Sequence, residues 1–158
     1  MRELPFGSNN NSELPDKEDE LRDFLEEVFK LDQSTSDRGN AKECYRRLQS
    51  KESEFVGSVI EDAYWNVVSL ELFHMAQIAT YDENDDQTRD LFLKALDAAK
   101  KGSGDEWIAY IEGTIYYLDN NQARLEQIMN RADGNVHVLQ RFLAGLKKRG
   151  APNYKTDY

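Results

Sequence analysis

The stretch that decides the fold is residues 53–81, SEFVGSVIEDAYWNVVSLELFHMAQIATY, the most apolar run of a very polar chain. A helix that is apolar over most of its circumference is a buried helix, so we expect a central helix here, against which the other segments pack. Two polar residues, Glu71 and His74, interrupt its apolar surface. The apolar positions form two adjacent stripes at helical spacing: Val56, Val59, Ala63, Leu70 and Phe73, and beside them Ile60, Tyr64, Val67 and Ile78.

The composition predicts one all-α domain. The chain has 158 residues, of which 39% are apolar and 32% charged, and it contains only three prolines and nine glycines. Few turn-forming residues favour long helices over a β protein. Its one cysteine, Cys44, cannot form an internal disulfide and has no CxxC partner, so we expect a small core residue on a helix. We find no secretory signal pattern and no apolar run long enough to span a membrane, which predicts a cytoplasmic protein without a membrane partner.

The expected organisation has three parts. Residues 1–15 combine two prolines with an Asn run and predict a flexible N-terminal arm. Residues 16–150 predict a single all-helical domain, and residues 151–158 an extended C-terminal tail. A helix is expected from Pro15 or Asp16 to about Leu31, and another begins near Ala41. Whether the second one runs on into the central helix stays open, because no proline forces a break. Further helices are expected at about 86–101, 105–118, 123–129 and 136–149.

Charge is unevenly distributed along the chain. The formal net charge is −10. Residues 1–37 hold 11 acidic and 4 basic side chains, whereas residues 138–158 hold 5 basic and 1 acidic. An acidic chain of this kind argues against nucleic-acid binding, which needs clustered positive charge. A basic protein partner for the acidic end is one interpretation, and an acidic immunity or inhibitor protein that binds a basic target is an alternative.

A short internal repeat accompanies the helical pattern. DQTR (86–89) matches NQAR (121–124) at an offset of 35, and Tyr81 matches Tyr116 at the same offset. A unit of about 34 residues is the tetratricopeptide period. Over about residues 65–132 the chain resembles the tetratricopeptide repeat superfamily (TPR-like). The resemblance implies antiparallel helical hairpins in a superhelix or bundle of 6–7 helices, with peptide binding on the concave face of the first helices. An unrelated antiparallel bundle stays the alternative. The matching residues are Gly113, Tyr116 and Ala123, and in the earlier unit Thr88, Phe92 and Ala95.

Glu71 and His74 are the residues with the most distinctive chemistry. Their Glu-x-x-His spacing places both on one face of a helix, as in ferritin-like di-iron proteins. Those proteins need the motif twice, and the second histidine, His137, follows Gly134 at that spacing rather than a glutamate. We therefore predict no metal and no cofactor, and leave open whether the pair is structural or binds a ligand. Arg131 and His137 have the R-x5-H spacing of the HEPN ribonuclease motif, but an expected turn separates them.

The hypothesis that fits best is a non-catalytic interaction, scaffold or adaptor protein, not an enzyme, that binds another protein or peptide; a homo-oligomer is compatible with it. A small metal-binding helical-bundle protein or enzyme centred on Glu71 and His74 is the alternative. Aromatic residues crowd two of the expected helices, so some of them should line a binding surface. The candidate partner-binding residues are Tyr64, Glu71, His74, Tyr110, Thr114 and Tyr117.

Overall fold

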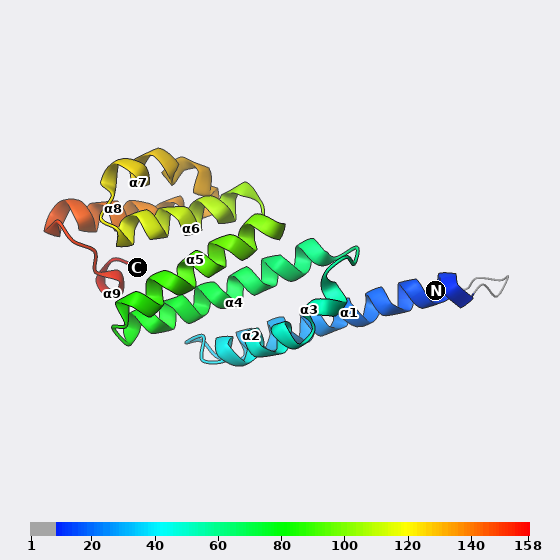
Figure 1. Ribbon diagram of the computed structural model, residues 1–158. Helices are drawn as coiled ribbons and strands as arrows, with labels where there is room; N and C mark the ends of the chain where they lie inside the picture. The colour runs from blue at the N-terminus through cyan, green and yellow to red at the C-terminus, as the bar shows by residue number, and fades with distance from the viewer. Residues whose placement is uncertain (1–8) are drawn as a thin grey trace.

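The computed structural model describes residues 9–158, with side chains from Asp16 onward, and this part of the chain is helical without a strand (Figure 1). The predicted all-α fold is confirmed. Six helices have ten or more residues, and shorter helices connect or follow them. In chain order they are α1 (Asn9–Gln33), α2 (Ala41–Ser50), α3 (Glu52–Phe55), α4 (Glu61–Tyr81), α5 (Asp85–Gly102), α6 (Asp105–Leu118), α7 (Gln122–Ile128), the 3-10 helix η1 (Met129–Asn135), α8 (Val136–Arg149) and α9 (Tyr154–Asp157).

The helices stack in chain order, from α1 and α2 at one end, through α4 and α5, to α6, α7 and α8 at the other (Figure 1). Helix α4 is the centre of the stack, since it contacts α1, α2, α5 and α9. One side chain of α4, Phe73, contacts both α5 and α6. Its ring centroid lies 4.9 Å from that of Phe92 on α5 and 5.0 Å from that of Trp107 on α6. Such offset aromatic contacts stabilise the core beyond simple area burial.

Two turns of the stack share one geometry. After α4 and after α6, the chain passes through a residue in the left-handed region, Glu83 at φ 58° and Asn120 at φ 56°. An asparagine then caps the next helix: Asn84 accepts a hydrogen bond from the Gln87 amide and Asn121 from the Arg124 amide. The turns therefore repeat from Asn84 to Asn121, an offset of 37. The sequence match at an offset of 35 therefore aligns residues that are not structurally equivalent. The length of the helix, and not the local sequence, sets the position of the turn.

The predicted central helix over residues 53–81 is wrong in its first part. The region from 41 to 81 forms three helices, α2, α3 and α4, and the chain leaves helical geometry between α3 and α4. Gly57 adopts φ +87°, a conformation that side chains other than glycine rarely take, and Glu61 accepts the Gly57 amide hydrogen bond at 2.9 Å. Val56 and Val59 are consequently 49% and 80% exposed, not buried on a stripe. Helix α4 itself is buried over much of its surface, as expected.

The predicted ends of the domain also differ from the structure. Helix α1 begins at Asn9, so part of the expected flexible arm is helical, and residues 1–8 lie outside the described part. The sequence predicts a helix start at Pro15 or Asp16, whereas the observed helix begins at Asn9 and passes through Pro15 at the loss of one backbone hydrogen bond.

The C-terminal tail, expected to be extended, folds back and forms α9. Asn153 caps this short helix by accepting a hydrogen bond from the Thr156 amide. Two of its side chains, Tyr154 and Asp157, are buried. A Cβ atom on Gly145 of α8 would overlap the Asp157 carboxylate, so glycine at this position is required for the close approach. The tail was misjudged because its order comes from these tertiary contacts and not from a periodic pattern.

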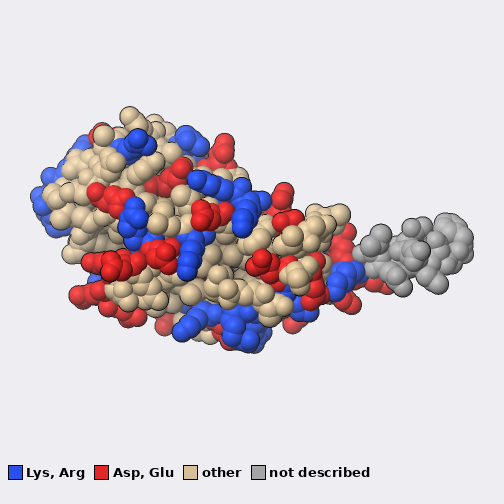
Figure 2. All heavy atoms as spheres, in the orientation of Figure 1, with Lys and Arg blue, Asp and Glu red and all other residues tan. Residues whose placement is uncertain are grey.

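Basic and acidic side chains are interspersed over the face of the molecule shown in Figure 2. Within residues 9–158, no helix combines the length and the apolar character needed to cross a membrane.

Candidate functional site

The first candidate site is an open pocket of about 340 Å³, which we call the groove. Its walls come from three helices that are first members of successive layers, α4, α6 and α8. Each of these helices turns a pair of side chains into the groove at a spacing of three or four residues, the spacing that puts both on one helix face. The pairs are His74 and Gln77, Trp107 and Tyr110, and His137 and Arg141.

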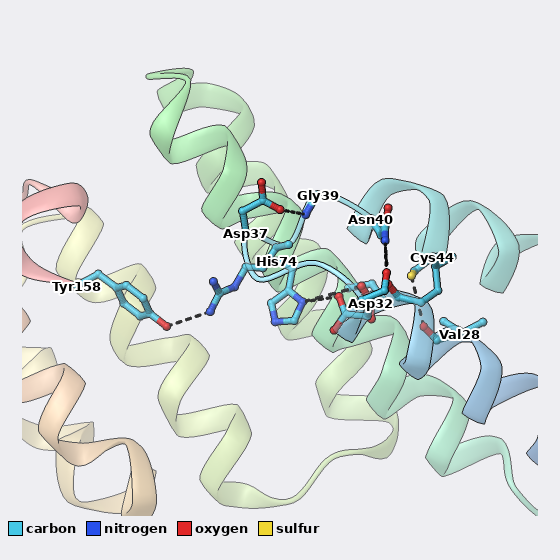
Figure 3. A network of polar contacts seen from close by, with 12 residues as sticks. Val28, Asp32, Asp37, Gly39, Asn40, Cys44, His74 and Tyr158 are labelled. Carbon is cyan, nitrogen blue, oxygen red and sulfur yellow. Dashed lines mark hydrogen bonds and ion pairs between the residues drawn. The ribbon is translucent and has the colours of Figure 1, made fainter.

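The groove is basic and aromatic in a chain of net charge −10. Arg38, from the α1–α2 loop, and Arg141 are its cations, and none of the described residues that line it is acidic. Tyr158, at the end of the tail, lies between them. The Arg141 Nη2 atom donates to the Tyr158 carbonyl at 2.7 Å. Arg38 Nη2 donates to the Tyr158 hydroxyl at 3.3 Å, the contact marked at Tyr158 in Figure 3. Two buried atoms of lining residues, Arg38 Nε and Gln77 Oε1, have no hydrogen-bond partner.

A second site lies next to the groove and shares His74 with it. Its core is three buried side chains, Asp32 from the end of α1, Cys44 from α2 and Glu71 from α4, and His74 of α4 contacts the two carboxylates. We call these four residues the buried cluster; Figure 3 labels Asp32, Cys44 and His74. His74 Nδ1 lies 3.0 Å from Asp32 Oδ1 and 3.9 Å from Glu71 Oε1. The donor atoms of Asp32, Cys44 and Glu71 all lie within 4.8 Å of one another.

The electrostatics of the buried cluster are unusual. Burial, together with the neighbouring Asp32, raises the pKa of Glu71 to about 9. Burial and the same two carboxyl groups raise the pKa of Cys44 to about 12. Burial lowers the pKa of His74, against the opposing effect of Asp32. Without a bound cation, the cluster therefore holds Glu71 and Cys44 in their neutral forms at pH 7.

The structure separates the six residues predicted to bind a partner. Tyr64, Thr114 and Tyr117 are fully buried; for example, the Tyr64 hydroxyl donates to the Leu48 carbonyl at 2.8 Å within the core. They form no part of an accessible surface. Glu71 is also fully buried, in the cluster. Only His74 and Tyr110 line the groove.

Several groove residues were not singled out from the sequence. Arg38, Arg141 and Tyr158 lie in segments interpreted as a linker, the last helix and an extended tail. The signal that could have found them is the spacing of His137 and Arg141, which places an imidazole and a guanidinium on one face of α8. Of the R-x5-H pair, His137 lines the groove, whereas Arg131 is exposed and the Asp133 kink separates them.

A larger pocket, of about 760 Å³, lies between the start of α5 and the tail. Its charges are largely paired with one another or with neighbours. Arg89 Nε lies 2.8 Å from Asp119 Oδ1, and Lys155 Nζ lies 3.3 Å from Glu83 Oε2. Paired, exposed charges offer little to a ligand, so size alone does not make this pocket the better candidate.

Comparison of the chain with models of protein families, with curated proteins and with solved structures finds no match. The arrangement of the residues is therefore the basis for function.

Proposed function

We propose that the protein is a non-catalytic interaction module that binds an acidic, aromatic-containing segment of another protein in the groove. One observation carries the proposal: two arginines and two histidines gather with aromatic rings in a pocket that no described acidic residue lines, in a strongly acidic chain. Positive charge beside aromatic surface suits a carboxylate next to a tyrosine or phenylalanine.

The chain's own tail supports this mode of recognition. Tyr158 places its ring 5.1 Å from the ring of Tyr154, while its carbonyl and hydroxyl oxygens accept from Arg141 and Arg38. A partner segment would use the same cations and the same stacking surface. The TPR-like resemblance, over about residues 65–132, implies a binding face on the first helices of successive hairpins, which would be α4 and α6, and α8 follows them along the groove.

The charge of the groove favours a partner opposite to the basic one expected from the N-terminal residues. A basic peptide would meet Arg38 and Arg141 without compensating carboxylates in the groove, and juxtaposed like charges oppose binding. The carboxylates of an acidic segment can accept hydrogen bonds from both guanidinium groups, including one from the unpartnered Arg38 Nε.

Peptide selection tests the proposal directly. A random phage-displayed library is selected on the full chain, and the affinities of the enriched peptides are measured by fluorescence anisotropy. We expect peptides rich in Asp, Glu and aromatic residues, and a loss of affinity of at least about tenfold for Arg141→Glu.

The control is Lys94→Glu, which reverses the same charge on α5, outside the groove. The affinity of this variant should stay within about twofold of the wild-type value, because an exposed charge far from the ligand is screened. Enrichment of basic peptides, failure to enrich any peptide, or equal losses in both variants would each overturn the proposal.

A further inference from the structure

The buried cluster has the donor atoms of a cation site. Carboxylate oxygens from Asp32 and Glu71 and the thiol of Cys44 converge within 4.8 Å, and all three side chains are buried. They come from three different helices, α1, α4 and α2. Chance proximity of acidic side chains is common on a protein surface, but it is costly in the interior, where each charge loses its hydration.

Glu71 gives a second, independent indication. It is 0% exposed, and neither of its carboxylate oxygens has a hydrogen-bond partner. A buried polar group without a partner costs about 1–3 kcal/mol, and folded proteins rarely leave one unsatisfied. Ligand-type side chains surround it: the donor atoms of Asp32 and Cys44 lie within 4.8 Å of its own, and His74 Nδ1 lies 3.9 Å from its Oε1. Cys44 Sγ donates to the Val28 carbonyl at 3.5 Å, and His74 Nδ1 is hydrogen-bonded to Asp32 Oδ1, so the unsatisfied atoms of the cluster are the two Glu71 oxygens. A bound cation would give these two oxygens a partner and draw the neighbouring donor atoms to the same ion.

The donor types indicate which cation fits. Magnesium and calcium prefer sites made only of oxygen ligands, whereas a thiolate and an imidazole favour a softer transition metal. Zinc accepts sulfur, nitrogen and carboxylate oxygen in four-coordinate sites. His74 supplies the nitrogen by exchanging its hydrogen bond with Asp32 Oδ1, at 3.0 Å, for the ion.

We propose that Asp32, Cys44, Glu71 and His74 bind one zinc ion, which links α1, α2 and α4. The site differs from the di-iron arrangement that the Glu-x-x-His spacing suggested, because one Glu-x-x-His motif combines with a thiol and a carboxylate from two other helices. His74 is 15% exposed and also lines the groove, so the ion enters from there. Binding makes the groove wall rigid, but peptide recognition does not depend on it.

Metal titration of the purified full chain, stripped with a chelator, is the test. We expect one zinc ion per chain by elemental analysis after dialysis. Cobalt(II) should replace zinc and produce the near-ultraviolet thiolate-to-cobalt charge-transfer absorption, which requires Cys44, the only cysteine of the chain. This spectrum is measured on the wild type, so it does not depend on whether a variant folds.

Two variants test the ligands Cys44 and Glu71, and a third is the control. Cys44→Ser should abolish the charge-transfer absorption and weaken zinc binding at least about tenfold, the lower limit of what changes just outside a metal site cost. Glu71→Gln should also weaken binding at least about tenfold, whereas Glu26→Gln, at an exposed position of α1, should leave it unchanged. Circular dichroism in chelator confirms that each variant is folded. Absence of the absorption from the wild type, or equal zinc affinity in all three variants, would overturn the proposal.

Discussion

Two buried carboxylates of the helix stack, Asp157 and Glu71, have opposite surroundings. Asp157 of α9 accepts a hydrogen bond from the Tyr117 hydroxyl at 2.6 Å and is paired with the guanidinium of Arg149. We call these three residues the tail anchor. Glu71 of α4 is more deeply buried, yet it has no hydrogen-bond donor and lies beside Asp32. One carboxylate completes a network, and the other lacks a partner.

The difference appears in their proton affinities. Burial alone would raise the pKa of Asp157, but the hydrogen bonds from Arg149 and Tyr117 outweigh it, and the pKa lies below the ordinary 3.8. No such donor opposes burial at Glu71, whose pKa rises to about 9. A buried carboxylate that serves the fold is therefore recognised by its donors. One without donors is a candidate ligand-binding group, which is why the tail anchor is structural and the buried cluster is proposed as a metal site.

Removal of the Asp157 carboxylate should have the largest effect. Asp157→Ala leaves the Tyr117 hydroxyl without its acceptor and Arg149 without its counter-ion. We expect a loss of about 2–3 kcal/mol in the free energy of unfolding, because hydrogen bonds to charged groups are the stronger ones. The partly exposed Arg149 can regain water, which keeps the loss below that of a fully buried pair. Urea denaturation measures the loss, and hydrogen exchange should locate the lost protection in residues 150–158.

The matching control is Asp97→Ala on the exposed face of α5, which should change the free energy of unfolding by less than about 0.5 kcal/mol. If the two variants were equally stable, the tail anchor would not stabilise the fold.

A methyl group on Gly145 should disturb the same anchor less. Gly145→Ala places a Cβ where the Asp157 carboxylate lies, so α9 has to shift. Overpacking of this kind costs about 1–3 kcal/mol, and the better helix propensity of alanine offsets up to about 1 kcal/mol of it. We expect a net loss of about 1–2 kcal/mol by urea denaturation.

Gly134→Ala is the control for this substitution, since no atom lies within 4 Å of the added Cβ there. It should be neutral or slightly stabilising. Equal losses of stability in the Gly134→Ala and Gly145→Ala variants would show that the contact with Asp157 is not the reason why residue 145 must be glycine.

Prediction from the sequence succeeded where structure is local. The helix expected over residues 136–149 coincides with α8, because its apolar residues keep one helical period and Gly150, in the left-handed region at φ 74°, ends it. The break before α4 was missed for the opposite reason. Val56 and Val59 continue the period of the stripe, and nothing in their identity shows that Gly57 turns the chain out of the helix.

The sites were harder to predict, because each is assembled from distant segments. Glu71 and His74 share one helix, so their spacing was visible, but Asp32 and Cys44 join them only through the packing of α1 and α2 on α4. Cys44 was expected to be a small core residue, and it is buried. Its proximity to two carboxylates results from tertiary packing, which the local sequence does not show. The same holds for Arg38 and Arg141, which meet at Tyr158 across the groove.

Replacement of Glu71 should have a smaller effect of opposite sign. In the presence of chelator, Glu71→Met exchanges an unpartnered carboxyl for an apolar group of similar length, and we expect a gain of about 1 kcal/mol in the free energy of unfolding at pH 7. The folded pKa of about 9 exceeds the ordinary 4.5, so the folded state binds the additional proton. Wild-type stability should therefore fall as pH rises from 4.5 towards 9, and the gap to the variant should widen. Destabilisation by Glu71→Met at all pH values would mean that the carboxyl has a structural partner.

Acid should reveal the smallest difference between the two carboxylates. The folded pKa of Asp157 is depressed, so its contribution to stability is fully present above pH 3.8 and is lost as pH falls through the lower folded value. Glu71 contributes no change there, because below pH 4.5 it is protonated in both the folded and the unfolded state. Hydrogen exchange between pH 5 and pH 2.5, corrected for the intrinsic rates, should show protection of α9 falling relative to that of α4. Asp157→Asn should abolish this pH dependence because it has no proton to gain. If α4 instead lost protection first, Glu71 and not Asp157 would be the carboxylate held ionised by its surroundings.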